Sequence, residues 1–410
     1  MDTSTEPDTP GCPVTQFGKL REQAPVVETP EFGVGPAHLV TRYEDVHAML
    51  ADPRFRCDAS SIAGAANGLP ALFEQLGMPD DLAYLGHGLL TRDGSEHARL
   101  RRLVSRAFTV RRVGALRPRV EALTEGLLDD AADAAKIGEA DGRPVDLVAA
   151  LAYPLPITVI CELVGVPEDR RARWRELGRS LTAPDPERLP EAARAVVAQV
   201  TELIEERRTD PADDLVTALV GVHDDDGDRL TEREMLTMVF DLVTAGFETT
   251  AHLISKAALA LLTRPDQLAA LRADPGLWPR AVHELVRTCS PVPIGLPRYP
   301  IADVEIGGVA VAEGSTVMAA LLSANFDPRA YDAPEDLDVR RHAGRGDGHL
   351  GFGHGAHYCL GAALARQEIE VALRAVFERF PDLRLADADA AAEPSQLGFH
   401  RLPELIVRLS

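Results

Sequence analysis

The segment Gly351-Phe-Gly-His-Gly-Ala-His-Tyr-Cys-Leu-Gly361 combines residue types that could hold a large cofactor. Its four glycines let the backbone bend tightly and come close to something flat or bulky. Cys359 stands just before a predicted helix over Ala362–Phe377, and the partial positive charge of a helix N-terminus favours a thiolate. A glycine-shaped loop around a lone thiolate suits a metal cofactor with one protein ligand. The alternative is a glycine-rich turn around a buried, inert cysteine.

A second segment, Ala245-Gly-Phe-Glu-Thr-Thr250, places a glycine inside a long helical pattern. Gly246 costs about 1 kcal/mol relative to alanine there, which indicates a purpose such as the approach of a ligand to the backbone. The alternative is a helical Thr249 that bonds back to its own carbonyl, beside a surface Glu248.

A third segment, Glu284-Leu-Val-Arg287, holds an acid and a base three residues apart. Residues at this spacing share one face of a helix and can bond to each other. Alone, the motif indicates only a solvated ion pair, because such pairs occur in most helices.

Together these segments resemble the motifs of the cytochrome P450 haem-thiolate monooxygenases. Residues 352–361 match the family's haem-binding loop F-G-x-G-x-H-x-C-x-G residue for residue. Residues 284–287 match its E-x-x-R motif, and residues 245–250 match its A-G-x-[DE]-T-T motif. Asp93-Gly-Ser-Glu-His-Ala-Arg-Leu-Arg-Arg102 matches the helix that carries H-x-x-x-R. All four motifs follow the order of the family.

The resemblance implies a role for each matched residue. Cys359 is expected to be the axial thiolate ligand of haem iron, donating electron density that favours O–O cleavage. Glu284 and Arg287 are expected to form a buried pair that braces the proximal side of the haem. Arg341 is the expected third partner of that pair.

The same resemblance implies the remaining cofactor contacts. Thr249 is expected to donate a hydrogen bond to bound dioxygen, and Glu248 to feed protons from solvent. His97 and Arg101, four residues apart on one helical face, are expected to bind a haem propionate. The other residues expected to contact haem are Arg298, His357, Ala245, Gly246, Phe352, Gly353 and Gly361. For Arg298 alone, a solvated strand arginine is an equal alternative.

Substrate specificity is expected where the family binds its substrates. The candidate pocket residues are Leu89, Asp241, Thr244, Ala245, Val292, Ile294 and Phe399. Asp241, Ala245 and Thr249 fall within one helical stripe. At the position of Asp241 the family usually has an apolar residue. An unpaired carboxylate facing an apolar pocket is costly. Asp241 is therefore hypothesised to bond a polar or cationic part of the substrate, with pairing to a nearby arginine as the alternative.

The implied function is a monooxygenase that inserts one oxygen atom from O2 into a medium-sized apolar substrate, by hydroxylation or epoxidation, in polyketide or peptide secondary metabolism. The implied cofactor is haem b, with O2 as co-substrate. Electrons are expected from NAD(P)H through a separate ferredoxin and ferredoxin reductase, because no flavin or iron–sulfur domain is fused. Arg99, Arg102 and Arg106 could form a basic patch that steers an acidic ferredoxin, or only a solvated helix face.

Other functions stay open at this point. A haem-thiolate enzyme could instead catalyse desaturation or oxidative coupling. A haem sensor or binding protein would keep the haem without oxygenation, and a helical binding module would lack haem. The intact Glu248–Thr249 pair favours the oxygenase, since a binder has no use for proton delivery.

These residues need a mostly helical scaffold. Apolar residues at spacings of three and four predict helices over Tyr43–Leu50, Ala115–Ala135, Pro144–Leu163, Arg171–Leu181, Pro190–Arg208 and Thr231–Leu262. The last begins with a capping box, Thr231-Glu-Arg-Glu234, and is long enough to cross a whole domain. Strands are predicted over Ala37–Val40, Val304–Val311, Thr316–Leu321 and Glu404–Leu409. Ala59–Gly88 is predicted to be a long mobile loop.

The predicted fold class is mainly α with a minor β region. The resemblance extends from about Val40 to Leu409. It implies one P450 domain over residues 32–410, a triangular helical body with haem between the long distal helix and the Cys-loop helix. Residues 1–31 are predicted to be a flexible N-terminal segment. Phe326 replaces an arginine often found in the family, away from the chemistry.

Composition limits the partners. Lysine and arginine total 43 against 64 aspartates and glutamates, so the formal net charge is −21 and nonspecific binding to nucleic acid or anionic lipid is disfavoured. Met1–Pro10 lacks the features of a signal peptide, and no apolar run reaches about 18 residues. A monomeric cytoplasmic protein that does not associate with membranes is expected. Five scattered cysteines without C-x-x-C argue against a disulfide framework or a structural zinc site.

Overall fold

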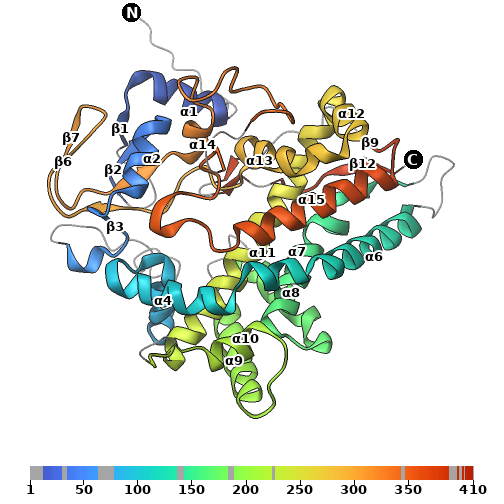
Figure 1. Cartoon of the computed structure of the whole chain (residues 1–410), viewed down its shortest axis with the longest axis horizontal. Coiled ribbons are helices and arrows are strands. Elements are labelled where there is room, and N and C mark those ends of the chain that lie inside the picture. Colours follow the sequence, from blue (N-terminus) through green and yellow to red (C-terminus); the bar gives the residue numbers. More distant parts are fainter. Residues whose placement is uncertain are drawn as a thin grey trace, which may run out of the picture.

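Helix α11, Glu232–Leu262, runs through the centre of the computed structural model (Figure 1). It begins at the predicted capping box, in which the Glu234 amide donates to Thr231 Oγ1 and the Thr231 amide donates to the Glu234 carboxylate. These two bonds satisfy amides that a helix start otherwise leaves unpaired. Most side chains of α11 are buried, as expected of a helix that is apolar on nearly all faces. The long predicted helix is confirmed.

The structure describes residues 13–29, 35–62, 78–135, 143–182, 189–223, 227–342, 347–386, 395–396, 399–400 and 402–409. Helices dominate these ranges and strands are few and short, so the mainly α fold with a minor β region is confirmed. Within the same ranges, none of the helices combines the length and hydropathy that a membrane span needs.

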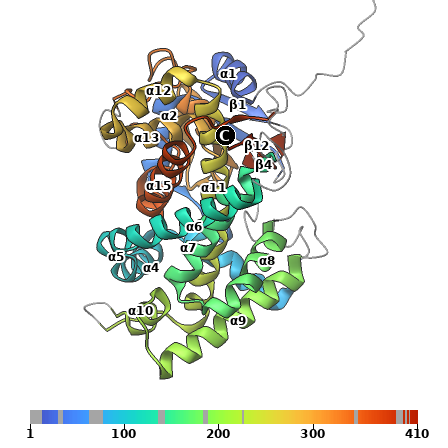
Figure 2. The ribbon, with the colours of Figure 1, turned by 90° about the vertical axis from the view of Figure 1, so that its right-hand side faces the viewer.

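The other helices surround α11. Those before it are α1 (Pro13–Gln23), α2 (Tyr43–Ala51), α4 (Gly94–Ala107), α5 (Val110–Ala115), α6 (Arg117–Ala135), α7 (Pro154–Val164), α8 (Arg171–Thr182), α9 (Leu189–Thr209) and α10 (Leu215–Gly221). Those after it are α12 (Pro265–Ala273), α13 (Trp278–Cys289), α14 (Leu321–Asn325) and α15 (Ala362–Arg379). Figure 2 shows α9 and α10 at the opposite end of the molecule from α12 and α13.

Short helical turns connect these helices. Six are of the 3₁₀ type: η1 (Ala59–Ser61), η2 (Asp80–His87), η3 (Leu89–Thr91), η5 (Glu168–Arg170), η6 (Pro275–Leu277) and η7 (Gly355–His357). One, η4 (Val148–Ala152), is a π-helical turn.

The strands form small sheets, most of them at one side of the helical body (Figure 1). The first sheet has the order β1-β2-β8, with β1 (Val26–Thr29) antiparallel and β8 (Val317–Ala319) parallel to the central β2 (Ala37–Val40). The second has the order β4-β12-β9, with β4 (Val145–Asp146), β12 (Ile406–Arg408) and β9 (Arg384–Leu385). Three antiparallel pairs are β3 (Phe55–Arg56) with β5 (Tyr299–Pro300), β6 (Val304–Ile306) with β7 (Val309–Val311), and β10 (Ser395–Gln396) with β11 (Phe399–His400).

Two predicted helices differ from the observed elements. The segment 144–163 is not one helix, because β4 pairs with β12 before η4 and α7 begins only at Pro154. Proline is tolerated in the first turn of a helix, where its missing amide costs nothing. Helix α6 begins at Arg117, and a separate α5 precedes it, capped by the side chain of Thr109.

Two segments predicted to be irregular are partly regular. Residues 13–29 of the predicted flexible segment form α1 and β1, because β1 finds a pairing edge on β2. Residues 1–12 and 30–31 lie outside the described residues. In the predicted loop 59–88, residues 59–62 and 78–88 contain η1 and η2, and residues 63–77 lie outside the described ranges.

Candidate functional site

A cavity of about 310 Å³ lies between α4, α11, the segment Gly351–Gly361 and α15. We call that segment the Cys359 loop. The predicted residues that line the cavity are Leu89, His97, Arg101, Asp241, Ala245, Gly246, Thr249, Val292, Phe352, Gly353, His357, Cys359 and Gly361. The Cys359 thiol and the Thr249 hydroxyl, 110 positions apart in sequence, thus share one mostly apolar cavity.

The Cys359 loop depends on its glycines. Gly353 and Gly355 have φ angles of +71° and +73°, a conformation that residues with a Cβ rarely adopt. At Gly355 a Cβ would also lie 2.3 Å from the carbonyl oxygen of Leu50, the penultimate residue of α2. The Cys359 amide donates to the Phe352 carbonyl at 2.9 Å and closes the loop.

Replacing Gly355 with alanine is expected to lower the free energy of unfolding by at least about 2 kcal/mol, because a strained φ and a backbone clash combine. Chemical denaturation followed by circular dichroism measures the change. Gly308→Ala is the matched control, since Gly308 has φ +84° and a Cβ there would meet no atom within 4 Å. Equal losses in the two variants would contradict the contribution of the Leu50 contact.

The Cys359 thiol lies in a protected position. Burial raises the pKa of Cys359, while hydrogen bonds from the backbone amides of Gly361 and Ala362 and the charge of Arg101 act in the opposite direction. These amides belong to the start of α15, as the sequence predicted. A bound metal ion removes the thiol proton outright, so this sulfur is suited to metal ligation.

Buried donors without a protein acceptor lie beside the loop. His97 Nε2 and Arg298 Nη1 are buried and have no hydrogen-bond partner among the described residues. Arg101 donates one hydrogen bond, to the Tyr358 carbonyl at 2.8 Å. Burial lowers the pKa of His97 to about 4 and that of Arg298 to about 10. Donors in this state fit a cofactor that brings its own carboxylates, as haem does.

His357 has neighbours that sequence reasoning missed. Its Nε2 lies 3.3 Å from Cys57 Sγ and 3.7 Å from Asp93 Oδ1, and its ring packs on that of His97. The other Asp93 oxygen accepts from the amides of Cys57 and Asp58. No sequence signal joins Cys57 to His357, because 300 residues separate them.

Thr249 and Glu248 occupy different surroundings on α11. Thr249 lines the cavity, and its hydroxyl donates to the Ala245 carbonyl at 2.8 Å, which is the back-bonding considered as an alternative. Glu248 is buried outside the cavity lining, with its Oε1 3.5 Å from His252 Nε2. The predicted role of Glu248 in feeding protons from solvent stays a prediction.

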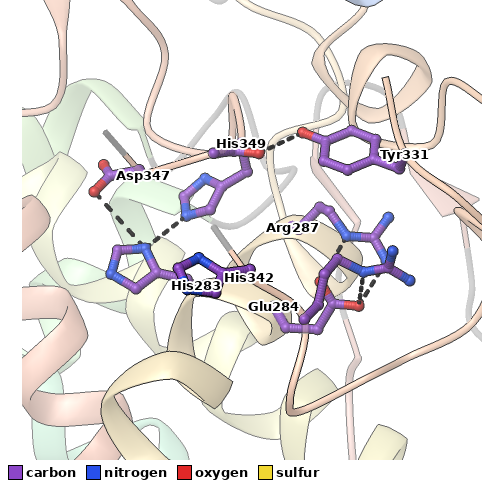
Figure 3. Close-up of a pocket in the computed structure, with 9 residues that line it drawn as sticks. His283, Glu284, Arg287, Tyr331, His342, Asp347 and His349 are labelled. Atoms are coloured by element: carbon purple, nitrogen blue, oxygen red, sulfur yellow. Dashed lines mark hydrogen bonds and ion pairs between the residues drawn. The ribbon is translucent and has the colours of Figure 1, made fainter. Parts of the chain in front are cut away.

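The predicted Glu284–Arg287 pair is buried and highly connected (Figure 3). Arg287 donates two hydrogen bonds to Glu284, at 2.7 and 2.8 Å, and further ones to the carbonyls of Asn325, Pro334 and Asp336. Arg341 donates to Glu284 at 3.0 Å, as the third member that the resemblance implied. The network therefore fixes the chain after α14 against α13.

A histidine pair adjoins this network (Figure 3). His283 Nδ1 lies 3.3 Å from His349 Nε2 and 3.7 Å from Asp347 Oδ1, and Tyr331 donates to the Gly348 carbonyl. Burial lowers the pKa of His349 to about 4 and also lowers that of His283, while the charge of Asp347 acts in the opposite direction on both. These contacts tie the entry of the Cys359 loop to α13.

Two predicted pocket residues, Thr244 and Ile294, are not among the described residues that line the cavity. Thr244 is not among the lining residues, and its hydroxyl donates to the Phe240 carbonyl. Ile294 packs against the cluster of Ala37, Leu39, Met318 and Ala320 instead. Phe399 lies in β11, and its side chain is outside the described part of the structure.

The three arginines of the predicted basic patch on α4 have partners within the chain. Arg99 forms ion pairs with Asp228 and Glu234, and Arg106 donates to the His223 carbonyl. Both arginines therefore hold α4 against the α10–α11 connection. Arg102 also has a partner.

Glu368 on α15 is a cavity residue that the sequence did not reveal. It is buried, lines the cavity, and its Oε2 has no hydrogen-bond partner among the described residues. Burial raises its pKa to about 8. The only signal was a glutamate on an otherwise apolar face of the predicted helix after Cys359.

Known proteins resemble this chain over most of its length. The family model described as cytochrome P450 matches residues 180–274 and 277–403. 6-Deoxyerythronolide B hydroxylase of Saccharopolyspora erythraea is 43% identical over 399 residues, which cover 96% of this chain and 95% of that protein. Mycinamicin IV hydroxylase/epoxidase of Micromonospora griseorubida is 41% identical over 90% of this chain and 88% of its own length. The solved structure of the bacillaene polyketide synthase cytochrome P450 PksS of Bacillus subtilis 168 has a TM-score of 0.86 and 33% identity, and the match covers 97% of each chain.

Proposed function

This chain belongs to the cytochrome P450 family, and from that premise we propose that it is a haem-dependent monooxygenase. It inserts one oxygen atom from O2 into a medium-sized apolar substrate, by hydroxylation or epoxidation. The observation that carries the proposal is the sharing of one apolar cavity by the Cys359 thiol and the Thr249 hydroxyl, beside buried donors that lack acceptors.

The roles of the residues follow from their positions. When bound, haem supplies the activation of dioxygen and the oxidation of the substrate. Cys359 Sγ would ligate its iron, and His97, Arg101, Arg298 and His357 would bind its carboxylates by charge-assisted hydrogen bonds. The apolar lining orients the substrate and excludes water.

Two residues of α11 would handle the protons that the reaction consumes. Thr249 holds a hydroxyl at the cavity wall, where rotation of its hydrogen from the Ala245 carbonyl turns the donor into the cavity. Glu248, the next residue toward the N-terminus, is buried, and its contact with His252 supports a proton route through that imidazole. This arrangement favours oxygenation over a simple haem-binding role.

The relatives suggest the class of substrate and the electron donors. Two are named for the hydroxylation or epoxidation of macrolide compounds, 6-deoxyerythronolide B and mycinamicin IV. From these names we propose that the substrate of this chain is a polyketide or peptide secondary metabolite. Electrons would come from NAD(P)H through a separate ferredoxin and its reductase.

The optical spectrum of the purified protein, reduced and exposed to carbon monoxide, tests the proposed function. A Soret band shifted strongly to the red, as thiolate-ligated haems give, is expected. A colourless protein, or a band typical of histidine ligation, would overturn the proposal.

Thr249→Ala is expected to lower the fraction of reducing equivalents recovered in product by about tenfold to a hundredfold, because proton delivery contributes about that much or more. The lost equivalents should appear as hydrogen peroxide or water, while substrate affinity stays the same. Thr244→Ala is the matched control, because Thr244 makes the same type of hydroxyl bond on the same helix but does not line the cavity. Equal uncoupling in both variants would assign the effect to the helix and not to the Thr249 hydroxyl.

A further inference from the structure

Asp241 places a carboxyl group in the wall of an otherwise apolar part of the cavity. It lies one helical turn before Ala245, and both residues line the cavity. The surface that Asp241 exposes faces this cavity, and protein atoms surround the carboxyl group on its other sides. Burial raises the pKa of Asp241 to about 8, opposed by a hydrogen bond from the Leu89 amide.

The hydrogen bonds of Asp241 are incomplete. The Leu89 amide is its one donor within the described chain, and Oδ2 is buried without any partner. A carboxylate can accept about four hydrogen bonds. None of the described arginines, lysines or histidines forms an ion pair with Asp241, so the arginine pairing considered from the sequence is not found there.

The carboxyl group of Asp241 packs against a residue that has no side chain. A Cβ at position 88 would lie 2.2 Å from Asp241 Oδ2 and 2.7 Å from Thr237 Cγ2, so Gly88 is packed directly against the acid. The side chain is held between α11 and the start of η3. Asp241 also lines the cavity, so a partner for its carboxyl group can approach from there.

The other titratable groups of the lining belong to different elements. They are His97, Arg101, His357, Tyr358, Cys359 and Glu368, and they come from α4, the Cys359 loop and α15. On η2, which packs against α11, Tyr84 lies under the guanidinium of Arg233. Among the described residues, Asp241 is the one titratable group that α11 contributes to the cavity.

We propose that Asp241 selects substrates that carry a basic amino group, which it binds as an ammonium inside the cavity. This inference rests on the proposed monooxygenase function and names the class of its substrate. An ammonium brings both the donor and the positive charge that a buried carboxylate lacks. An apolar cavity alone would reject a cation, so the carboxyl group of Asp241 reverses the preference.

Two probes of equal shape test the proposal on the haem-loaded protein. They are 1-(dimethylamino)adamantane, whose crowded nitrogen is a poor ligand for iron, and its uncharged carbon analogue 1-isopropyladamantane. Equilibrium dialysis is expected to show tighter binding of the amine. Asp241→Asn should weaken amine binding about tenfold or more and leave the hydrocarbon unaffected. Asparagine keeps an acceptor for the Leu89 amide, so the wall itself is preserved.

Proton release gives a second readout. At pH 7 the free carboxyl is mostly protonated, since its pKa is about 8. Pairing with an ammonium ionises it, so a proton should leave on amine binding at pH 7, and this release should fall as the pH rises above about 8. Calorimetry in two buffers of different ionisation enthalpy measures this number, and Asp241→Asn should release none.

Glu368→Gln is the control, because it removes another buried cavity acid on α15. It should leave the preference for the amine intact, and loss of the preference in this variant would contradict the role of Asp241. The proposal also fails if both probes bind the wild type equally. It also fails if 1-methoxyadamantane, a neutral hydrogen-bond acceptor, binds more tightly than the amine and this tighter binding depends on Asp241. If these binding experiments contradict the proposal while the protein gives a normal thiolate spectrum, only the role of Asp241 is overturned and the monooxygenase function is unaffected.

Discussion

Replacing Cys359 with histidine is expected to abolish the far-red Soret band of the reduced carbon monoxide complex and to lower oxygenation by about a thousandfold. The thiolate donates electron density to iron that a neutral imidazole does not match. Histidine still offers a ligand, so the variant can keep haem and its spectrum can be read. The reduced difference spectrum and product formation per haem are the two measurements.

Cys161→Ala is the control for this variant. Cys161 is fully buried in α7, where burial raises its pKa to about 12, and it does not line the cavity. The control should keep the thiolate spectrum even if its stability falls. A thiolate band that survives in Cys359→His would assign the ligand to another cysteine.

Replacing Glu284 with alanine is expected to lower the free energy of unfolding by about 3–5 kcal/mol, the usual cost of removing one partner of a buried ion pair. Arg287 is 1% exposed and would keep its three carbonyl acceptors but lose its counter-charge. Arg341 would lose the same carboxylate. Denaturant unfolding, with haem retention recorded in parallel, measures the loss.

The exposed pair Arg374–Glu378 provides the comparison. Its partners are 43% and 57% exposed on α15, so Glu378→Ala should cost less than about 1 kcal/mol.

Burial raises the pKa of Glu284, but the hydrogen bonds and charge of Arg287 outweigh it, so the pKa lies below its ordinary value. The contribution of ionised Glu284 to the free energy of unfolding is thus fully present above the pKa that Glu284 has in the unfolded chain. It is lost as the pH falls through the lower pKa that Glu284 has in the folded protein. The advantage of the wild type over Glu284→Gln should therefore shrink in acid.

The helical stripe of α11 explains which cavity residues could be predicted. Lining residues recur three or four apart along it: Met238, Asp241, Leu242, Ala245, Gly246, Thr249, Thr250 and Leu253. A helix turns about 100° per residue, so Asp241, Ala245 and Thr249 share this face while Thr244 points away from it. This geometry accounts for the absence of Thr244 from the residues that line the cavity.

Irregular backbone was less predictable. Ile294 lies in Pro291-Val-Pro-Ile-Gly-Leu-Pro297, where no helical or strand period tells which side chains face inward. Arg99 and Arg106 found partners on the α10–α11 connection, more than 100 residues away. Contacts at such separation leave no local pattern, which is also why Cys57 gave little signal.

The Cys359 loop is built from parts of the chain that are far apart. Gly355 rests on Leu50, His357 touches Cys57, and the Tyr358 carbonyl accepts from Arg101 across 257 residues. Contacts that span such distances form slowly, because each must first close a long stretch of unfolded chain. During synthesis, the residues that contact the Cys359 loop cannot form these contacts until Cys359 has left the ribosome. Helices close in sequence, such as α8 and α9, can pack together earlier. Cofactor capture is thus a late event in biogenesis, and a chain cut short before this loop would fold in part but stay colourless.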